Sequence, residues 1–83
     1  MPFFLQNGGY MNEMIRSNLT GHNYRKNEAI FIVNPTQAAF YMDNDLMPID
    51  MYPSKDYKTQ KPIVVFAFNR EKTKPLFDKW CNR

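Results

Sequence analysis

The chain offers few side chains that could act as a nucleophile or as a general base. His22 is the only histidine and Cys81 the only cysteine. His22 could serve as a base for Ser17 or Ser54, but no motif of nucleophilic catalysis surrounds any of them. One cysteine and one histidine cannot build a structural zinc site. We expect His22 to lie in a solvated loop and Cys81 to pack on a helix face.

Acidic side chains could in principle hold a divalent cation. Asp43, Asp45 and Asp50 lie close together in the sequence. However, Asp43-Asn44-Asp45 lacks the glycine and the distal glutamate of a calcium loop, and these residue types are common at helix ends. Gly8-Gly9 is not followed by the lysine and hydroxyl of a phosphate-binding loop. We therefore expect no catalytic residue, no metal and no cofactor, and we expect that the protein is not an enzyme.

Length and cysteine content restrict the class of protein. A chain of 83 residues forms one small domain. A single cysteine favours a reducing, intracellular environment. The apolar start, residues 1–5, lacks the basic region and cleavage site of a signal peptide. No apolar run approaches the length of roughly 18 residues that a membrane span needs, so we expect no membrane partner.

Charge is distributed unevenly around the net value of +3. Residues 28–52 contain four acidic and no basic side chains, whereas residues 53–83 contain eight basic and three acidic ones. The basic part could bind a polyanion. The acidic part argues against a protein whose whole surface is covered by nucleic acid.

Apolar patterns predict three strands and two helices after an N-terminal segment. Residues 29–33 and 47–52 favour strands, and residues 62–68 form an apolar run whose two alternating faces are both apolar. Asn34 and Pro35 predict the start of the first helix. We expect the last helix to begin at Thr73, because Pro75 would then lie in its first turn. Its apolar side carries Leu76, Phe77, Trp80 and Cys81.

This order of elements predicts an α+β fold with a three-stranded antiparallel sheet. A right-handed crossover leaves room for the third strand between the other two, giving the order 1-3-2 of a split β-α-β arrangement, with both helices on one face. We expect a single domain with a core at 28–83. For residues 1–27 we expect a hairpin at Asn7-Gly8 and a short helix that Asn12 caps. This helix would carry Met14, Ile15 and Leu19, with Gly21 just after its end.

Alternation along the strands predicts one aliphatic and one aromatic sheet face. The aliphatic face, under the helices, would carry Ile30, Ile32, Ile63, Val65 and Ala67, with Met47, Ile49 and Met51 from the edge strand. The aromatic face would carry Phe31, Tyr52, Phe66 and Phe68 with Val33, Val64 and Asp50, and these four rings are our candidate binding residues. Lys55, Lys58 and Lys61 form a basic loop beside them.

Such an apolar surface exceeds what a monomer usually leaves exposed. Three explanations stay open: cover by residues 1–27, an interface with a second copy or another protein, and stacking of nucleic acid bases.

Two resemblances bear on these alternatives. Residues 30–34 resemble the first-strand motif of RNA-recognition-motif domains, and Phe66-Ala67-Phe68 is similar to the third-strand motif whose rings stack bases. Over residues 30–83, the chain resembles a group of small domains of unknown function from bacterial and phage genomes, through Ala38-Ala39-Phe40-Tyr41, residues 64–69 and the terminal aromatic helix. The second resemblance implies a mobile-element origin and a bacterial cytoplasm, and it supplies no catalytic residue.

We therefore expect a small phage- or prophage-encoded binding protein that occupies a host protein or a protein–nucleic acid complex. A counter-defence inhibitor, such as an anti-CRISPR protein, would fit this description. The charge blocks also suit a homodimer. The alternative is binding of single-stranded RNA or DNA through the aromatic sheet face.

Overall fold

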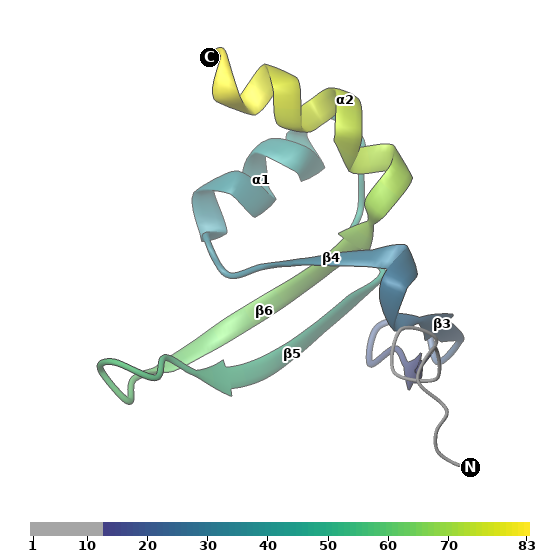
Figure 1. The fold of residues 1–83 in the computed structure, drawn as a ribbon, viewed down its shortest axis with the longest axis vertical. Coiled ribbons are helices and arrows are strands. Elements are labelled where there is room, and N and C mark those ends of the chain that lie inside the picture. Colours follow the sequence, from purple (N-terminus) through teal and green to yellow (C-terminus); the bar gives the residue numbers. More distant parts are fainter. Residues whose placement is uncertain (1–12) are drawn as a thin grey trace, which may run out of the picture.

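The computed structural model describes residues 13–83 (Figure 1). The strands are β2 (Met14–Arg16), β3 (Asn23–Arg25), β4 (Ala29–Ile32), β5 (Asp50–Lys55) and β6 (Pro62–Asn69), and a 3-10 turn, η2 (Lys26–Glu28), joins β3 to β4. The helices are α1 (Pro35–Asp43) and α2 (Arg70–Cys81). Strands β4, β6 and β5 form an antiparallel sheet with β6 at its centre, and β2 pairs with β3 in a second, two-stranded sheet. The predicted α+β class is confirmed, with a three-stranded antiparallel sheet and two helices.

The short helix expected to carry Met14, Ile15 and Leu19 is wrong, because residues 14–25 form the β2–β3 hairpin. The hydroxyl of Ser17 accepts hydrogen bonds from the amides of Leu19 and Thr20, both 3.0 Å long, and so closes the connecting loop. Gly21 has a φ of 76°, which glycine adopts without steric cost. Ile15 packs against the larger sheet, so tertiary contacts override the weak helical pattern. The hairpin expected at Asn7-Gly8 lies outside the described residues.

Helix α1 begins where the sequence predicts. The side chain of Asn34 accepts hydrogen bonds from the amides of Thr36 at 2.9 Å and Gln37 at 3.3 Å. Pro35 occupies the first helical position, where its missing N–H would have no partner anyway. The helix ends at Asp43 with Asn44 as its C-cap, and Asp45 has a positive φ of 68°. The Asp43-Asn44-Asp45 sequence is thus the end of a helix.

Strand β5 begins and ends three residues later than predicted. It starts at Asp50 rather than at Met47, because Pro48 cannot donate to a ladder. Ile49 lies before the strand but donates its N–H to the carbonyl of Ala67 at 2.7 Å. The strand continues through Pro53 to Lys55. A proline is tolerated inside this strand because β5 lies at the edge of the sheet.

Helix α2 begins earlier than predicted, directly after β6. Asn69 is the cap and accepts a hydrogen bond of 3.1 Å from the amide of Lys72. Thr73, the predicted cap, is buried and donates its hydroxyl hydrogen to the carbonyl of Arg70 at 2.7 Å. Pro75 therefore lies inside the helix, where a proline removes one backbone hydrogen bond. The cap at the strand end outweighs the signal from the proline.

The buried side of α2 also differs from the prediction. Thr73 and Leu76 are buried and Trp80 is half-buried. Phe77 is 48% exposed and Cys81 is exposed, so the expected packing role of Cys81 is wrong. Positions 73, 76 and 80 follow the spacing of one helix face, whereas positions 77 and 81 lie one further step of about 100° around it.

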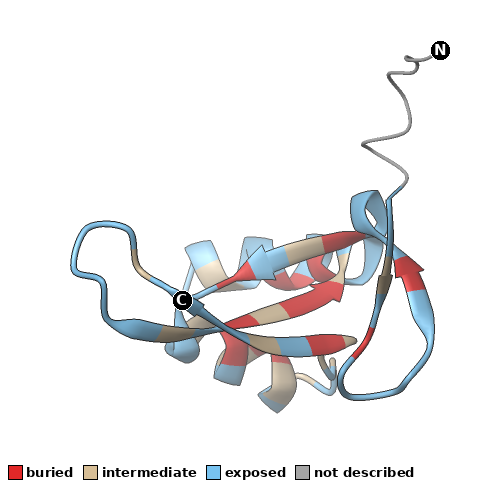
Figure 2. Ribbon diagram, turned by 90° about the horizontal axis from the view of Figure 1, so that it is seen from below, coloured by how far each residue is buried: buried red, intermediate tan, exposed pale blue. Residues whose placement is uncertain are grey.

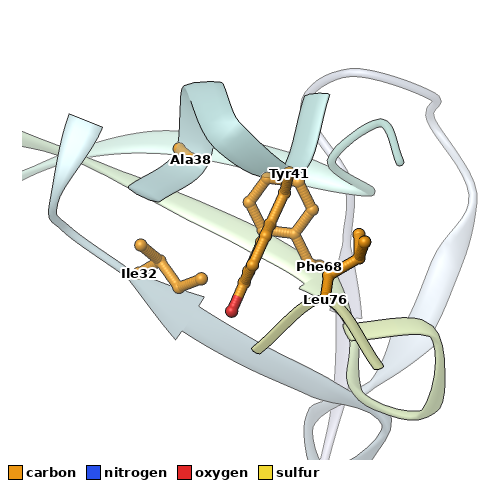
Figure 3. Packing of buried hydrophobic residues seen from close by; sticks show 5 residues of the cluster. All are labelled: Ile32, Ala38, Tyr41, Phe68 and Leu76. Atoms are coloured by element: carbon orange, nitrogen blue, oxygen red, sulfur yellow. The ribbon is translucent and has the colours of Figure 1, made fainter. Parts of the chain in front are cut away.

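The main hydrophobic core lies between the sheet and the two helices (Figures 1 and 3). Its fully or nearly buried members are Ile32, Ala38, Tyr41, Phe68 and Leu76. The ring of Tyr41 meets that of Phe68 edge to face, with centroids 5.2 Å apart. This packing covers one face of the sheet with α1 and α2.

The predicted division of the sheet into an aliphatic and an aromatic face is wrong. Ile30 pairs with Phe68 and Ile32 pairs with Phe66, and residues opposite each other share a face. The two phenylalanines of β6 therefore lie under the helices, and Ala67 lies on the other face beside Phe31. When a strand is apolar on both faces, its sequence does not show which residues face the helices, because a shift of the register by one residue exchanges the two faces.

The β2–β3 hairpin covers part of the second sheet face. Tyr24, Ala29 and Ala67 are buried together there, with Ile15 and Ile49 against them. Residues 14–25 thus cover one end of this face, at Asp50 and Ala67 (Figure 2). The outer ends of β5 and β6, with the loop between them, are mostly exposed (Figure 2).

Candidate binding surface

The two longest strands project beyond the third as an arm, which we define as residues 53–64. β5 pairs with β6 from Asp50–Ala67 out to Lys55–Pro62, whereas the pairing of β4 with β6 ends at Ile32–Phe66. The outer half of β6 therefore has β5 on one side and no strand on the other among the described residues. Figure 1 shows the arm and its loop reaching away from both helices.

The tip of the arm is a hydrogen-bonded loop. The amide of Asp56 donates to the carbonyl of Lys61 at 3.0 Å, and the amide of Gln60 donates to the carbonyl of Asp56 at 2.8 Å. The carboxylate of Asp56 accepts from the amides of Lys58 at 2.8 Å and Thr59 at 3.2 Å. These contacts fix the backbone of the loop, and they give the Asp56 carboxylate a structural role.

An aromatic ring and several lysines stand on this loop. Tyr57 is 95% exposed, the largest exposure among the large apolar side chains of residues 13–83. Lys55, Lys58 and Lys61 are exposed on the same short segment. The three predicted basic residues are thus brought together. Sequence reasoning missed Tyr57, although an aromatic residue between lysines in a polar loop is a recognisable signal.

Two open grooves flank the arm. The first has a volume of about 430 Å³ and is lined by the apolar residues Val33, Pro35, Pro53, Pro62, Ile63, Val64 and Phe66. The second has a volume of about 470 Å³ and a mixed lining of Val33, Ser54, Lys55, Asp56, Tyr57, Lys58, Ile63 and Val65. One side of the arm is therefore lined by apolar residues, and the other combines apolar and aromatic side chains with two basic and one acidic side chain.

The four predicted aromatic binding residues do not form one platform. Phe31 and Tyr52 lie together on the sheet face opposite the helices, with ring centroids 6.4 Å apart in an edge-to-face arrangement. Phe31 is 37% exposed. Burial, and then the negative charge of Asp50, raise the pKa of Tyr52. Phe66 and Phe68 lie on the opposite side, and Phe68 is fully buried in the core.

Asp50 is a buried structural residue rather than an exposed charge at the edge of the sheet. It is 1% exposed. Its carboxylate accepts hydrogen bonds from the hydroxyl of Tyr24 at 2.7 Å and from the amides of Asn18 and Met51, both at 2.8 Å. Sequence reasoning missed this network, because its members are separated by up to 32 residues and no local pattern links them.

The residues considered for catalysis are separated or have structural roles. The hydroxyl of Ser17 is buried and donates to the carbonyl of Ile49. His22 is exposed in the hairpin loop, and Ser54 is exposed on the arm. Within residues 13–83, no group of three histidine, cysteine or acidic side chains is placed to hold a metal ion.

Neither helix in the described part of the chain is long and apolar enough to cross a lipid bilayer. Comparison of the chain with protein-family models, with curated proteins and with solved structures gives no significant match. The candidate surface must therefore be interpreted from its own geometry and chemistry.

Proposed function

We propose that this chain is a non-enzymatic binding protein that occupies an acidic surface of a host macromolecule with its β5–β6 arm. The observation that carries this proposal is the loop at the tip of the arm, where the exposed ring of Tyr57 stands among three lysines on a hydrogen-bonded backbone. Aromatic residues are enriched at the energetic centres of protein interfaces. A loop that is already ordered loses less conformational entropy on binding.

The biological setting is part of the same proposal. The resemblance to small domains of phage and bacterial genomes supports a phage- or prophage-encoded protein that acts in the cytoplasm of a bacterial host. Its core corresponds to a split β-α-β unit, a scaffold that hosts many unrelated functions. A counter-defence inhibitor of the anti-CRISPR kind fits a protein that works by occupying a partner without any chemistry of its own.

A photo-crosslinking amino acid at position 57 tests the role of the arm. We expect crosslinking in host lysate to one acidic partner, and we expect Lys55→Glu with Lys58→Glu to abolish the crosslink. The same crosslinker at Lys72, on α2, is the matched control, because α2 lies away from the arm (Figure 1). Equal crosslinking from both positions, or crosslinking that survives charge reversal, would contradict the proposal.

Self-association is a further part of the proposal. Glu28, Asp43 and Asp45 are exposed, so the acidic segment of one copy could meet the basic arm of another. In a symmetric dimer this contact between an acidic segment and a basic arm would form twice. Light scattering coupled to size-exclusion chromatography at low and high salt tests this directly. A monomeric mass at high protein concentration and low salt would exclude it.

A second candidate function is binding of single-stranded nucleic acid, which the pair of Phe31 and Tyr52 favours. This pair lies on the face opposite the helices, and each base stacked on an aromatic ring contributes about 1–3 kcal/mol. The burial of Asp50 removes one carboxylate from the exposed surface. We rank this function second because Phe66 and Phe68 are not available on that face. Fluorescence anisotropy with RNA and DNA at two salt concentrations, comparing the wild type with Phe31→Ala, tests it.

A further inference from the structure

We propose that the partner binds as an extended protein segment with alternating apolar and acidic side chains, which adds as a strand to the free edge of β6 in the arm. This inference deepens the proposed function and rests on it. It specifies the chemistry of the partner and the backbone atoms that recognise it.

The free edge results from the different lengths of the strands. The pairing of β4 with β6 ends at Ile32–Phe66, yet β6 begins at Pro62. After Ile32 the chain leaves the sheet and enters α1. Among the described residues, no strand pairs with positions 62–65 on that side. Strand edges of this kind are the sites at which extended peptides add to a sheet.

The backbone of Val64 points towards this edge. Val64 is opposite Pro53, which has no N–H to donate. Two residues earlier, Met51 donates its N–H to the carboxylate of Asp50 and accepts at its carbonyl from the side chain of Asn18, so its backbone faces away from β6. Pairs two positions apart in an antiparallel ladder are of the same type, so the backbone groups of Pro53 and Val64 also point away from each other. The amide and the carbonyl of Val64 thus face away from β5. They offer a donor and an acceptor to an added strand.

The two grooves on either side of the arm predict the sequence pattern of that strand. Side chains of a strand point alternately to opposite faces, so successive residues of the added segment would enter different grooves. One groove is lined by apolar residues, which include Val64 and Phe66. The other includes Lys55 and Lys58. Apolar side chains suit the first groove and carboxylates suit the second.

The length of the edge limits the strength of this contact. Pro62 has no N–H, so the part of the edge that can donate is short. Specificity must then come from the side chains in the two grooves and from the lysines, and backbone pairing sets their register.

A designed peptide tests this inference before the natural partner is identified. The probe is a fluorescein-labelled peptide of about eight residues that alternates valine and glutamate, and its binding to the full chain is followed by fluorescence anisotropy at low salt. The control peptide has the same composition, with all valines preceding all glutamates. We expect the alternating peptide to bind at least about tenfold more tightly than the control.

Two variants locate the contact on the arm. Val64→Pro removes the outward-facing N–H and replaces one apolar side chain of the first groove, so we expect the fold to be kept and peptide affinity to fall about tenfold. Lys55→Glu with Lys58→Glu should weaken binding by a similar or larger factor, whereas Lys72→Glu on α2 should leave it unchanged. Circular dichroism confirms that each variant is folded. If Val64→Pro does not fold, the lysine variants and the control peptide still decide the outcome.

Several outcomes would overturn the inference. Equal binding of the two peptides would exclude strand addition, as would unchanged binding by a folded Val64→Pro variant. If a labelled oligonucleotide of about 12 nucleotides bound preferentially at the same lysines, the partner of the arm would be nucleic acid and not a protein segment. If the peptides fail but position 57 still crosslinks to an acidic partner, only this inference fails. If neither experiment detects binding through the arm, the proposed function fails as well.

Discussion

The hydroxyl of Tyr24 donates a hydrogen bond of 2.7 Å to the carboxylate of Asp50, and both side chains are buried. Tyr24 belongs to the β2–β3 hairpin, and Asp50 begins strand β5. This contact, with the amide of Asn18 on the same carboxylate, joins the hairpin to the main sheet. The attachment therefore combines a small apolar contact with buried polar groups whose partners are far away in the sequence.

Removal of the Tyr24 hydroxyl should destabilise the protein. In Tyr24→Phe the buried carboxylate of Asp50 loses one of its donors, and we expect the free energy of unfolding to fall by about 1–3 kcal/mol. Asp50→Ala should cost at least as much, because it leaves the donors of Tyr24, Asn18 and Met51 without their acceptor. Urea denaturation measures both effects. Tyr57→Phe, at an exposed position, is the control and should leave stability unchanged.

The same tyrosine predicts a loss of stability at alkaline pH. Burial, and then the hydrogen bond to Asp50, raise the pKa of Tyr24 above its ordinary value of 10.0. The unfolded chain releases this proton near pH 10, while the folded protein retains it, so the unfolded state binds fewer protons and becomes favoured as the pH rises. The stability that the raised pKa of Tyr24 contributes to the folded state is complete below about pH 10 and is lost progressively above it.

Thermal melting at pH values between about 8 and 11 measures this effect. Tyr24→Phe should lose less stability over this range than the wild type. Parallel curves for the two proteins would show that Tyr24 does not titrate differently in the folded and unfolded states.

Paired substitutions of phenylalanines test the assignment of the two sheet faces. Phe68 is fully buried among the helices and Phe31 is 37% exposed. We expect Phe68→Ala to cost about 3–5 kcal/mol of unfolding free energy. Phe31→Ala should cost about 1 kcal/mol. Chemical denaturation measures both, and equal losses would show that the two rings are buried to a similar extent.

Helix α2 carries a destabilising residue that can be replaced. Pro75 lies beyond the first turn and cannot donate to the carbonyl of Glu71. We expect Pro75→Ala to stabilise the protein, by up to about 3 kcal/mol. Pro35→Ala is the matched control, because Pro35 stands at the first position of α1, where proline is well tolerated. A lower melting temperature for Pro75→Ala would contradict this expectation.

Local signals predicted the elements of this protein better than they predicted the relation between them. Asn34 and Pro35 mark the start of α1 because their effect depends only on the next few residues. The phase of β6 could not be deduced, because Phe66 and Val65 are both apolar and only pairing with Ile32 decides which faces the helices.

The candidate site was predicted only in part, because local patterns do not show which residues distant in sequence come together. The three lysines of the arm are neighbours in sequence, and the structure keeps them together. The four aromatic residues come from different strands, so their grouping depended on the sheet register, which separates Phe31 and Tyr52 from Phe66 and Phe68. The polar contacts of Asp50 are also long-range, and the sequence contains no marker for them.

The arm also has a consequence for the order in which the chain folds. The pairing of β5 with β6 closes only the short loop at residues 56–61, whereas the pairing of β4 with β6 must close the long connection that contains α1 and β5. Loop-closure entropy grows with length, and hairpins form within about 1–10 μs. We therefore expect the β5–β6 hairpin to form before the core is assembled. The segment that we propose to bind the partner would then be ordered early, independently of much of the remaining sheet.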